Sequence, residues 1–186
     1  MEEVIIRNKR FKLIISELQL QFRIQSIAEQ INQDYEDKFP LIIGVLNGAA
    51  IFTSDLIRNL TVNPELAFFK VSSYGNNMFS EGVEELELGD KIDLKDRHVI
   101  LVEDIIDTGE TSNFLRKYVK DKEPASVKMI SLLFKPDSFL CGKKPEYIGF
   151  DIPPIFVVGY GMDFAQEGRG LKGVYQLNES PSSSLI

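Results

Sequence analysis

The residues best suited to chemistry follow an apolar run, Val-Ile-Leu-Val, at positions 99–102. Glu103 and Asp104 come directly after this run, and Asp107 follows three residues later. A continuous run of aliphatic and β-branched residues is typical of a parallel strand that is buried on both faces, and ligands bind beyond the carboxyl ends of such strands. Three carboxylates this close together repel one another unless hydroxyl groups, a proton or a metal ion occupy the space between them.

A turn with the sequence Thr-Gly-Glu-Thr follows at positions 108–111 and leads into a helix expected over residues 112–120. Free N–H groups and the positive end of the dipole at a helix N-terminus attract phosphate, and Gly109 allows the backbone to approach an anion closely. A metal-bound sugar phosphate would satisfy both the turn and the acids. Its phosphate would lie on the helix N-terminus, its ribose hydroxyls would face the two adjacent acids, and the third acid would lie near the anomeric carbon.

A simpler interpretation of this stretch stays open. Asp107 or Thr108 caps the helix in this interpretation, while Glu103 and Asp104 are solvated at a strand end. An isolated Asp-Thr-Gly triplet occurs often by chance. The full stretch of residues 99–111 is much longer than that triplet, which favours the sugar-phosphate interpretation.

Composition and charge restrict the classes of function. The chain has 186 residues, 44% hydrophobic and 26% charged, which suits one globular domain with a sizeable core. A formal net charge of −7 argues against broad binding of nucleic acid or anionic membranes. An acidic protein that binds a polyanionic sugar must rely on backbone donors, a few placed cations and a divalent metal ion, so the charge itself implies Mg²⁺.

The cysteine and histidine content narrows the chemistry further. Cys141 is the single cysteine, which excludes an internal disulfide framework and fits a reducing compartment. His98 is the single histidine and precedes the buried strand, at the end opposite the acids, so it is predicted to be structural rather than the base of a nucleophilic site. Residues 1–10 lack a signal-peptide core and no eighteen apolar residues run together, so a cytoplasmic protein is expected.

Alternating helix and strand patterns predict an α/β fold, a mainly parallel sheet with helices on both faces. An amphipathic helix capped by Ser16 is expected to bury Leu20, Ile24, Ile27 and Ile31, and a second helix is expected over 51–60. Further strands are expected at 41–46, 66–72, 127–134 and 155–159. Residues 73–96 are predicted to form a long loop, either a lid or a disordered segment, and the polar tail at 178–184 is expected to fray.

The stretch at 99–111 resembles the 5-phosphoribosyl 1-pyrophosphate motif of the type I phosphoribosyltransferases. Segments at 45–50, 72–75 and 156–163 through Arg169 resemble, in order, those of the hypoxanthine (hypoxanthine-guanine) phosphoribosyltransferases. The matching segments span roughly residues 41–171. The resemblance implies a single domain over 1–186, with a core at about 38–140 and a small hood made from the N-terminal segment and about 141–175. The ligand would lie between core and hood.

The resemblance also implies roles for the matching residues. Asp107 is expected to be catalytic and to handle the proton at purine N7. The phosphoribosyl group is expected at Glu103, Asp104, Asp107, Thr108, Gly109, Glu110 and Thr111. Pyrophosphate is expected at Leu46, Asn47, Gly48, Ser73, Tyr74 and Arg169, and the purine at Lys135, Phe156, Val157 and Asp163. Mg²⁺ is expected at Glu103, Asp104 and Asp163.

Three of these assignments have ordinary alternatives. The resemblance implies a cis peptide bond between Leu46 and Asn47 whose amide faces the pyrophosphate, whereas the residues alone favour a simple Asn-Gly turn. Family members often have lysine where this chain has Asn47. A lysine at a strand end such as Lys135 is commonly a solvated charge, and an aromatic such as Phe156 is commonly part of the core.

The implied reaction transfers the phosphoribosyl group from 5-phosphoribosyl 1-pyrophosphate to N9 of hypoxanthine, and of guanine, in purine salvage. One alternative is a phosphoribosyltransferase for xanthine, adenine or orotate. Another is an RNA-binding regulator on the same fold that senses 5-phosphoribosyl 1-pyrophosphate, which would need a basic face. The expected partners are small-molecule substrates, without nucleic acid or membrane, in a homodimer or homotetramer.

Overall fold

The computed structural model describes residues 2–70, 87–88 and 92–178. Its main sheet contains the strands β3 (Pro40–Leu46), β4 (Glu65–Lys70), β5 (Glu87–Leu88), β6 (His98–Ile106), β7 (Ser126–Phe134) and β8 (Tyr147–Asp151). A smaller sheet contains β1 (Glu3–Ile6), β2 (Lys9–Ile15), β9 (Val157–Val158) and β10 (Val174–Leu177). The helices are α1 (Glu17–Asp34), α2 (Ala50–Asn59), α3 (Glu110–Lys120) and a 3-10 turn at Pro136–Ser138.

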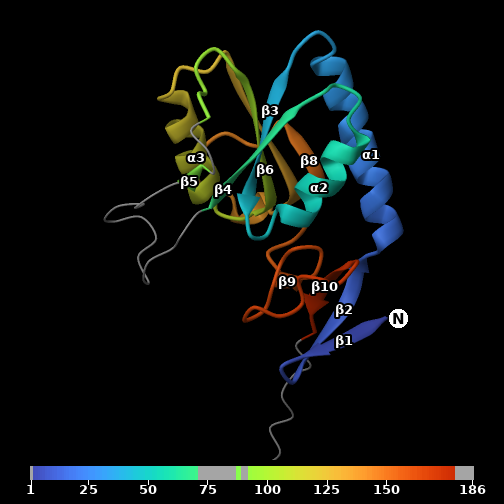
Figure 1. The fold of residues 1–186 in the computed structure, drawn as a ribbon. Helices are drawn as coiled ribbons and strands as arrows, with labels where there is room; N and C mark the ends of the chain where they lie inside the picture. The colour runs from blue at the N-terminus through green and yellow to red at the C-terminus, as the bar shows by residue number, and fades with distance from the viewer. Residues whose placement is uncertain (1, 71–86, 89–91, 179–186) are drawn as a thin grey trace, which may run out of the picture.

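The main sheet has the strand order β5-β4-β3-β6-β7-β8. All neighbouring pairs from β4 to β8 are parallel, and β5 pairs antiparallel with β4. The carboxyl ends of the parallel strands therefore meet along one edge of the sheet. Figure 1 shows the smaller sheet, with the order β1-β2-β10-β9, beyond that edge. The expected α/β class with a mainly parallel sheet is confirmed.

The central strand β6 separates two apolar layers. Ile100 and Val102 pack with the buried residues of α1 and α2 on one face. Val99 and Leu101 pack with Leu115 of α3 on the other face. Because a strand alternates its side chains between the two faces, an unbroken apolar run is what a sheet covered by helices on both faces requires. Helices on both faces were predicted, and Figure 1 shows them there.

Helix α1 begins as predicted. The Ser16 hydroxyl accepts a hydrogen bond from the Gln19 N–H at 3.4 Å, and the Gln19 side-chain oxygen accepts one from the Ser16 N–H at 2.9 Å. These reciprocal contacts satisfy donors that a helix N-terminus otherwise leaves free. The residues buried along α1 are Leu20, Ile24, Ile27, Ala28 and Ile31. None of the helices in the described ranges is long and apolar enough to cross a membrane.

The prediction that the strand ends at residue 102 is wrong. β6 continues to Ile106 because β7 keeps pairing with it, with Glu103 opposite Ser131 and Ile106 opposite Phe134. Glu103 and Asp104 therefore lie within the last part of the strand. Asp107 is the first residue after it, which places this carboxylate at the sheet edge.

Several short strands were not predicted. β8 lies in a stretch that its prolines made look irregular, yet it pairs in parallel with β7 as the edge strand of the main sheet. Residues 147–151 fall in the stretch at about 141–175 that the resemblance assigned to the hood, but they pair within the main sheet. β1 and β2 form an antiparallel hairpin, and β10 joins β2 to β9. The strand predicted over 155–159 is limited to Val157–Val158.

The remaining predictions concern a loop, the C-terminal tail and His98. Most of the loop predicted at 73–96 and the tail after 178 lie outside the described residues. His98 lies at the start of β6, with its Nδ1 atom 2.8 Å from Ser126 Oγ and its ring packed edge-on against Tyr35. This position supports the structural role predicted for His98, because it is at the end of the strand opposite the acids.

Candidate active site

The predicted site residues gather where β3, β6 and β7 end. Asn47 and Gly48 follow β3, Asp107 follows β6, and Lys135 follows β7. These three strands are neighbours in the sheet, so their carboxyl ends bring the three loops to one edge. The smaller sheet and the loops that connect it lie beyond this edge (Figure 1).

The loop after β3 packs directly on the acids of β6. A Cβ atom added at Gly48 would lie 1.8 Å from the Asp104 Oδ2 atom, so only glycine permits this approach. Burial raises the pKa of Asp104 to about 6, while the Ile105 backbone N–H and the Arg169 charge oppose the rise. Burial also raises the pKa of Glu103 well above its ordinary value, and its Oε1 atom has no hydrogen-bond partner. Two neighbouring carboxyl groups here thus have a strong tendency to bind a proton or a polar ligand.

Asp107 and Lys135 form an ion pair across the ends of β6 and β7. Lys135 Nζ donates to Asp107 Oδ2 at 2.5 Å. The Lys135 side chain is 11% exposed and the Asp107 side chain 48% exposed, so the pair spans from the core to the surface of the site. A charge-assisted bond of this length fixes the direction of both side chains.

The turn before α3 has the geometry of an anion site. Gly109 has a φ of +90°, a left-handed conformation, and is the N-cap of α3. The Glu110 N–H donates to Thr108 Oγ1 at 3.5 Å, and Glu110 and Thr111 form the first turn of the helix. A helix N-terminus entered through glycine exposes N–H groups to an anion.

A segment that the sequence did not single out supports this turn. The Thr108 carbonyl accepts hydrogen bonds from the N–H groups of Leu140 and Cys141, at 2.9 and 3.3 Å. A Cβ atom at Gly109 would lie 2.3 Å from the Cys141 carbonyl oxygen. The contact joins residues that are about thirty positions apart, and no periodicity or motif in the sequence could have indicated it.

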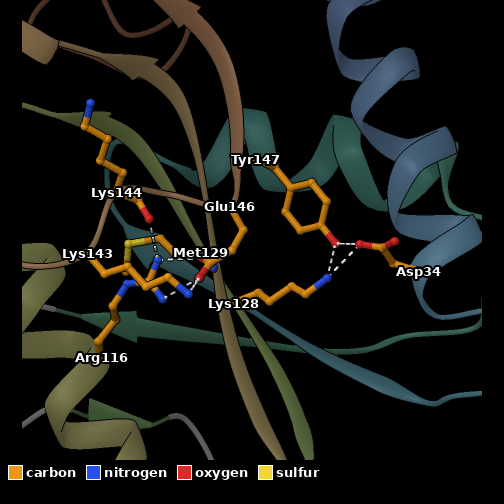
Figure 2. Close-up of polar contacts among 8 residues, drawn as sticks. All are labelled: Asp34, Arg116, Lys128, Met129, Lys143, Lys144, Glu146 and Tyr147. Carbon is orange, nitrogen blue, oxygen red and sulfur yellow. Dashed lines mark hydrogen bonds and ion pairs between the residues drawn. The ribbon is translucent and has the colours of Figure 1, made fainter.

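Helix α3 itself is held by a buried ion pair. Arg116 donates to both carboxylate oxygens of Glu146, at 3.2 and 2.6 Å, and to the Lys144 carbonyl at 3.3 Å (Figure 2). Glu146 also accepts the Met129 backbone N–H of β7 at 2.8 Å. Burial opposes ionisation of Glu146, but the hydrogen bonds from Arg116, Lys143 and the Met129 N–H together outweigh it, so the pKa of Glu146 is lowered. The network ties the helix behind the turn to the main sheet.

The loop after β9 adds opposite charges. Arg169 Nη2 lies 2.7 Å from Asp163 Oδ1, and Arg169 Nη1 donates to the Gly161 carbonyl at 2.8 Å. The charges of Asp163 and Arg169 both act on the Asp104 carboxyl, in opposite directions. This loop therefore reaches the acids at the end of β6.

An aromatic cluster extends from β9 toward β2. Phe156 is 46% exposed, and its ring centroid lies 5.8 Å from that of Phe164 and 6.4 Å from that of Phe11. Val157, the next residue, is buried in β9. An aromatic ring that is supported at its edges while one part stays exposed is suited to stacking on a planar ligand.

Comparison with known proteins identifies the family. Residues 15–165 match the phosphoribosyl transferase domain. The chain is 36% identical over 179 residues to the hypoxanthine-guanine phosphoribosyltransferase of Streptococcus pneumoniae (strain ATCC BAA-255 / R6), an alignment that covers 96% of this chain and 99% of that protein. The chain belongs to the hypoxanthine-guanine phosphoribosyltransferase family.

Two further relatives agree with this assignment to the hypoxanthine-guanine phosphoribosyltransferase family. The hypoxanthine-guanine phosphoribosyltransferase of Bacillus subtilis (strain 168) is 37% identical over 160 residues, covering 86% of this chain and 89% of that protein. A crystal structure of a hypoxanthine-guanine phosphoribosyltransferase from Bacillus anthracis superposes with a TM-score of 0.82 at 36% identity. That superposition covers 90% of this chain and 98% of the other. The resemblance and the fold expected from the sequence are thereby confirmed.

The peptide bond between Leu46 and Asn47 is cis, as the resemblance to the phosphoribosyltransferases implied, and the simple Asn-Gly turn is excluded. The Asn47 side chain is exposed. Ser73 and Tyr74, expected to cover the pyrophosphate, lie outside the described residues.

The acidic residues of the site fit a Mg²⁺ ion that binds together with the substrate. Across the described ranges, no three histidine, cysteine or acidic side chains gather as a ready-made metal cage. Asp104 and Asp163 are close enough for their charges to interact, whereas Glu103 precedes Asp104 on β6 and points to the opposite face of the strand. Mg²⁺ is usually bound by one or two carboxylates together with substrate phosphates, so the carboxylates of Asp104 and Asp163 fit a site of this kind.

Proposed function

We propose that this protein transfers the 5-phosphoribosyl group of 5-phosphoribosyl 1-pyrophosphate to N9 of hypoxanthine, and of guanine, and releases pyrophosphate. The products are IMP and GMP, the nucleotides of purine salvage. The observation that carries the proposal is the ion pair between Lys135 and Asp107 beside the anion-binding turn. A 6-oxopurine presents O6, which needs a donor, next to N7–H, which needs an acceptor. An ammonium and a carboxylate side by side complement that edge.

In the proposed reaction, purine N9 attacks the anomeric carbon as the bond to pyrophosphate breaks, and the leaving group keeps the bonding electrons. Positive charge that develops on the ribose ring would be favoured by the carboxylate of Asp104. Asp107 accepts the proton from purine N7, which restores the neutral base. The N–H groups at Gly109, Glu110 and Thr111, with the Thr108 hydroxyl, hold the 5′-phosphate.

The pyrophosphate would bind the cis amide at Leu46–Asn47, the backbone of Gly48 and the guanidinium of Arg169. Arginine suits a two-point grip on phosphate oxygens. Mg²⁺, held by Asp104 and Asp163 with Glu103 nearby, would neutralise charge on the pyrophosphate when bound.

The purine would stack on Phe156, whose edges are supported by neighbouring rings. The main chain near Val157 and Asp163 would face the 2-position, where guanine and hypoxanthine differ. We further propose that the protein works in the cytoplasm as a homodimer or homotetramer.

A base panel tests the proposal. Hypoxanthine, guanine, xanthine, adenine and orotate are each incubated with 5-phosphoribosyl 1-pyrophosphate and Mg²⁺, and the nucleotide products are identified by mass spectrometry. IMP and GMP are expected. In a Lys135→Met variant, turnover of both 6-oxopurines should fall while binding of 5-phosphoribosyl 1-pyrophosphate is retained, since a lost polar pairing changes specificity strongly. Adenine as the best substrate of the wild type would overturn the proposal.

A further inference from the structure

Tyr160 connects the loop after β9 to helix α2. Its side chain is 5% exposed, and its hydroxyl donates to Asp55 Oδ2 of α2 at 2.5 Å. Its backbone N–H donates to the Leu171 carbonyl at 2.8 Å, and its φ is +50°, a conformation that residues other than glycine seldom adopt. Several contacts are therefore needed to hold this residue where it is.

The residue after Tyr160 touches the loop that begins α2. A Cβ atom added at Gly161 would lie 2.0 Å from the Gly48 carbonyl oxygen. The Gly161 carbonyl in turn accepts a hydrogen bond from Arg169. We call residues 159–163 the hood loop. Its backbone lies between the Asn47–Gly48 loop and Arg169, the two groups proposed to bind pyrophosphate.

We infer that Tyr160 is a positioning residue for the pyrophosphate group, because its hydrogen bond to Asp55 sets the distance between the hood loop and the Asn47–Gly48 loop. The inference rests on the proposed function and adds to it two residues, Tyr160 and Asp55, that do not touch the substrate. α2 follows the Asn47–Gly48 loop directly. A hydrogen bond from the hood loop to α2 therefore keeps the Asn47–Gly48 loop and the hood loop, the two sides of the proposed pyrophosphate site, at a fixed distance. Groups held in place before binding lose less entropy when the ligand arrives.

The chemistry of the contact allows a specific test. Burial raises the pKa of Tyr160, and the adjacent Asp55 carboxylate raises it further, so the hydroxyl keeps its proton and remains the donor. The acceptor needs only an oxygen atom. Asparagine at position 55 supplies one, whereas alanine does not.

Steady-state kinetics with hypoxanthine should be measured for Tyr160→Phe, Asp55→Ala, Asp55→Asn and the double variant Tyr160→Phe/Asp55→Ala. We expect Tyr160→Phe and Asp55→Ala each to raise the KM for 5-phosphoribosyl 1-pyrophosphate by about three- to tenfold, the size of one net hydrogen bond. The KM for hypoxanthine and kcat should change by less than about twofold. The double variant should be no worse than either single variant, and Asp55→Asn should stay close to the wild type.

The chain contains a matched control. Tyr147 is also 5% exposed, and its hydroxyl donates to a carboxylate, Asp34 Oδ2, at 2.5 Å (Figure 2). This contact lies at the start of β8, at the end of the sheet away from the site. The Tyr147 hydroxyl also accepts a hydrogen bond from Lys128 at 2.9 Å. Tyr147→Phe should lower the unfolding temperature without a change in the KM for 5-phosphoribosyl 1-pyrophosphate, so it reports the structural effect of losing a buried tyrosine hydroxyl away from the site.

The outcomes separate this inference from the proposed function. If the wild type forms no nucleotide from any base, the proposed function fails and the inference fails with it. If the wild type forms IMP but Tyr160→Phe has an unchanged KM for 5-phosphoribosyl 1-pyrophosphate, as Tyr147→Phe should, the inference alone is overturned. An Asp55→Asn variant as impaired as Asp55→Ala would also overturn it, because the charge rather than the hydrogen bond would then be required.

Discussion

Asp107 and Lys135 contact each other at 2.5 Å across the ends of β6 and β7. The lysine emerges from the core, while the aspartate is about half exposed. Because Lys135 is the more buried of the two, its ammonium group orients the Asp107 carboxylate. A substitution at Asp107 can therefore remove its acid–base chemistry while leaving the lysine in place.

Asp107→Asn should lower kcat by about 10²- to 10⁴-fold, the usual contribution of a general acid or base. Asparagine keeps an oxygen that can accept a hydrogen bond from Lys135 but cannot take a proton near neutral pH. The KM for 5-phosphoribosyl 1-pyrophosphate should change much less. Initial rates measured at varied concentrations of this substrate provide the check, and a variant with the kcat of the wild type would end the proton-transfer assignment.

The Asn47–Gly48 loop should be sensitive at the glycine and tolerant at the asparagine. Asn47→Ala should change kcat/KM by less than about tenfold, or ~1.4 kcal/mol, if the backbone carries the contact with pyrophosphate. Gly48→Val should be far more damaging, because its Cβ atom would overlap with Asp104 Oδ2. Kinetics of both variants decide the matter. Should Asn47→Ala prove the worse of the two, the side chain carries the contact.

At the scale of elements, α3 must be fixed for its N-terminus to serve as an anion site. Arg116 fixes α3 on its buried side. Its side chain is 5% exposed and donates hydrogen bonds to both carboxylate oxygens of Glu146. Lys143 contacts the same carboxylate at 2.8 Å but is 71% exposed. Glu146 therefore pairs with one buried cation, Arg116, and one exposed cation, Lys143. A substitution at Lys143 can serve as the control for one at Arg116.

Arg116→Ala should lower the free energy of unfolding by about 3 kcal/mol, because it leaves the carboxylate of Glu146 without its buried partner. Lys143→Ala should cost less than about 1 kcal/mol, as is usual for an exposed ion pair. Urea denaturation followed by circular dichroism measures both. Equal losses for the two variants would mean that burial does not distinguish these ion pairs.

The sequence was sufficient for the elements whose residues repeat a clear pattern. The apolar run at 99–102 and the capping signal at Ser16 predicted β6 and α1 because local sequence and tertiary burial agree there. β8 and the hairpin of β1 and β2 were missed, since short strands with mixed or proline-flanked sequences take their structure from the neighbour with which they pair.

The candidate site divides in the same way. The acids and the turn at 103–111 could be predicted as candidate site residues, because they are contiguous and match a motif. Tyr160 and Asp55 could not be predicted, because they are 105 positions apart and neither residue carries a local signal. The support of Gly109 by Cys141 is another contact that exists only in three dimensions.

For the whole molecule, the stability of the fold and the needs of the site oppose each other at Asp104. Its pKa is about 6 in the folded protein, against an ordinary value of 3.8. The folded state therefore binds this proton more tightly than the unfolded chain does. As pH rises from about 4 to about 6, the free energy of unfolding therefore falls, and the folded state stays less stable above pH 6.

Asp104→Asn should accordingly raise the free energy of unfolding at pH 7.5 by up to about 3 kcal/mol, and the gain should vanish near pH 4. Denaturation curves of both proteins at the two pH values, with EDTA present, provide the measurement. The same variant should lose activity, because the carboxylate is proposed to serve the substrate. A gain of equal size at both pH values would contradict the role given to ionisation.

The pairing of β2 with β10 has a consequence for how the protein is made. Residue 11 pairs with residue 177, so the smaller sheet cannot form until almost the whole described chain has left the ribosome. The parallel sheet, from β3 to β8, can assemble earlier, because all its strands precede residue 152. During synthesis, the parallel sheet of the nascent chain can thus be folded before the smaller sheet has formed on the other side of the site. The smaller sheet is completed in a single late step, only after residue 177 has been synthesised.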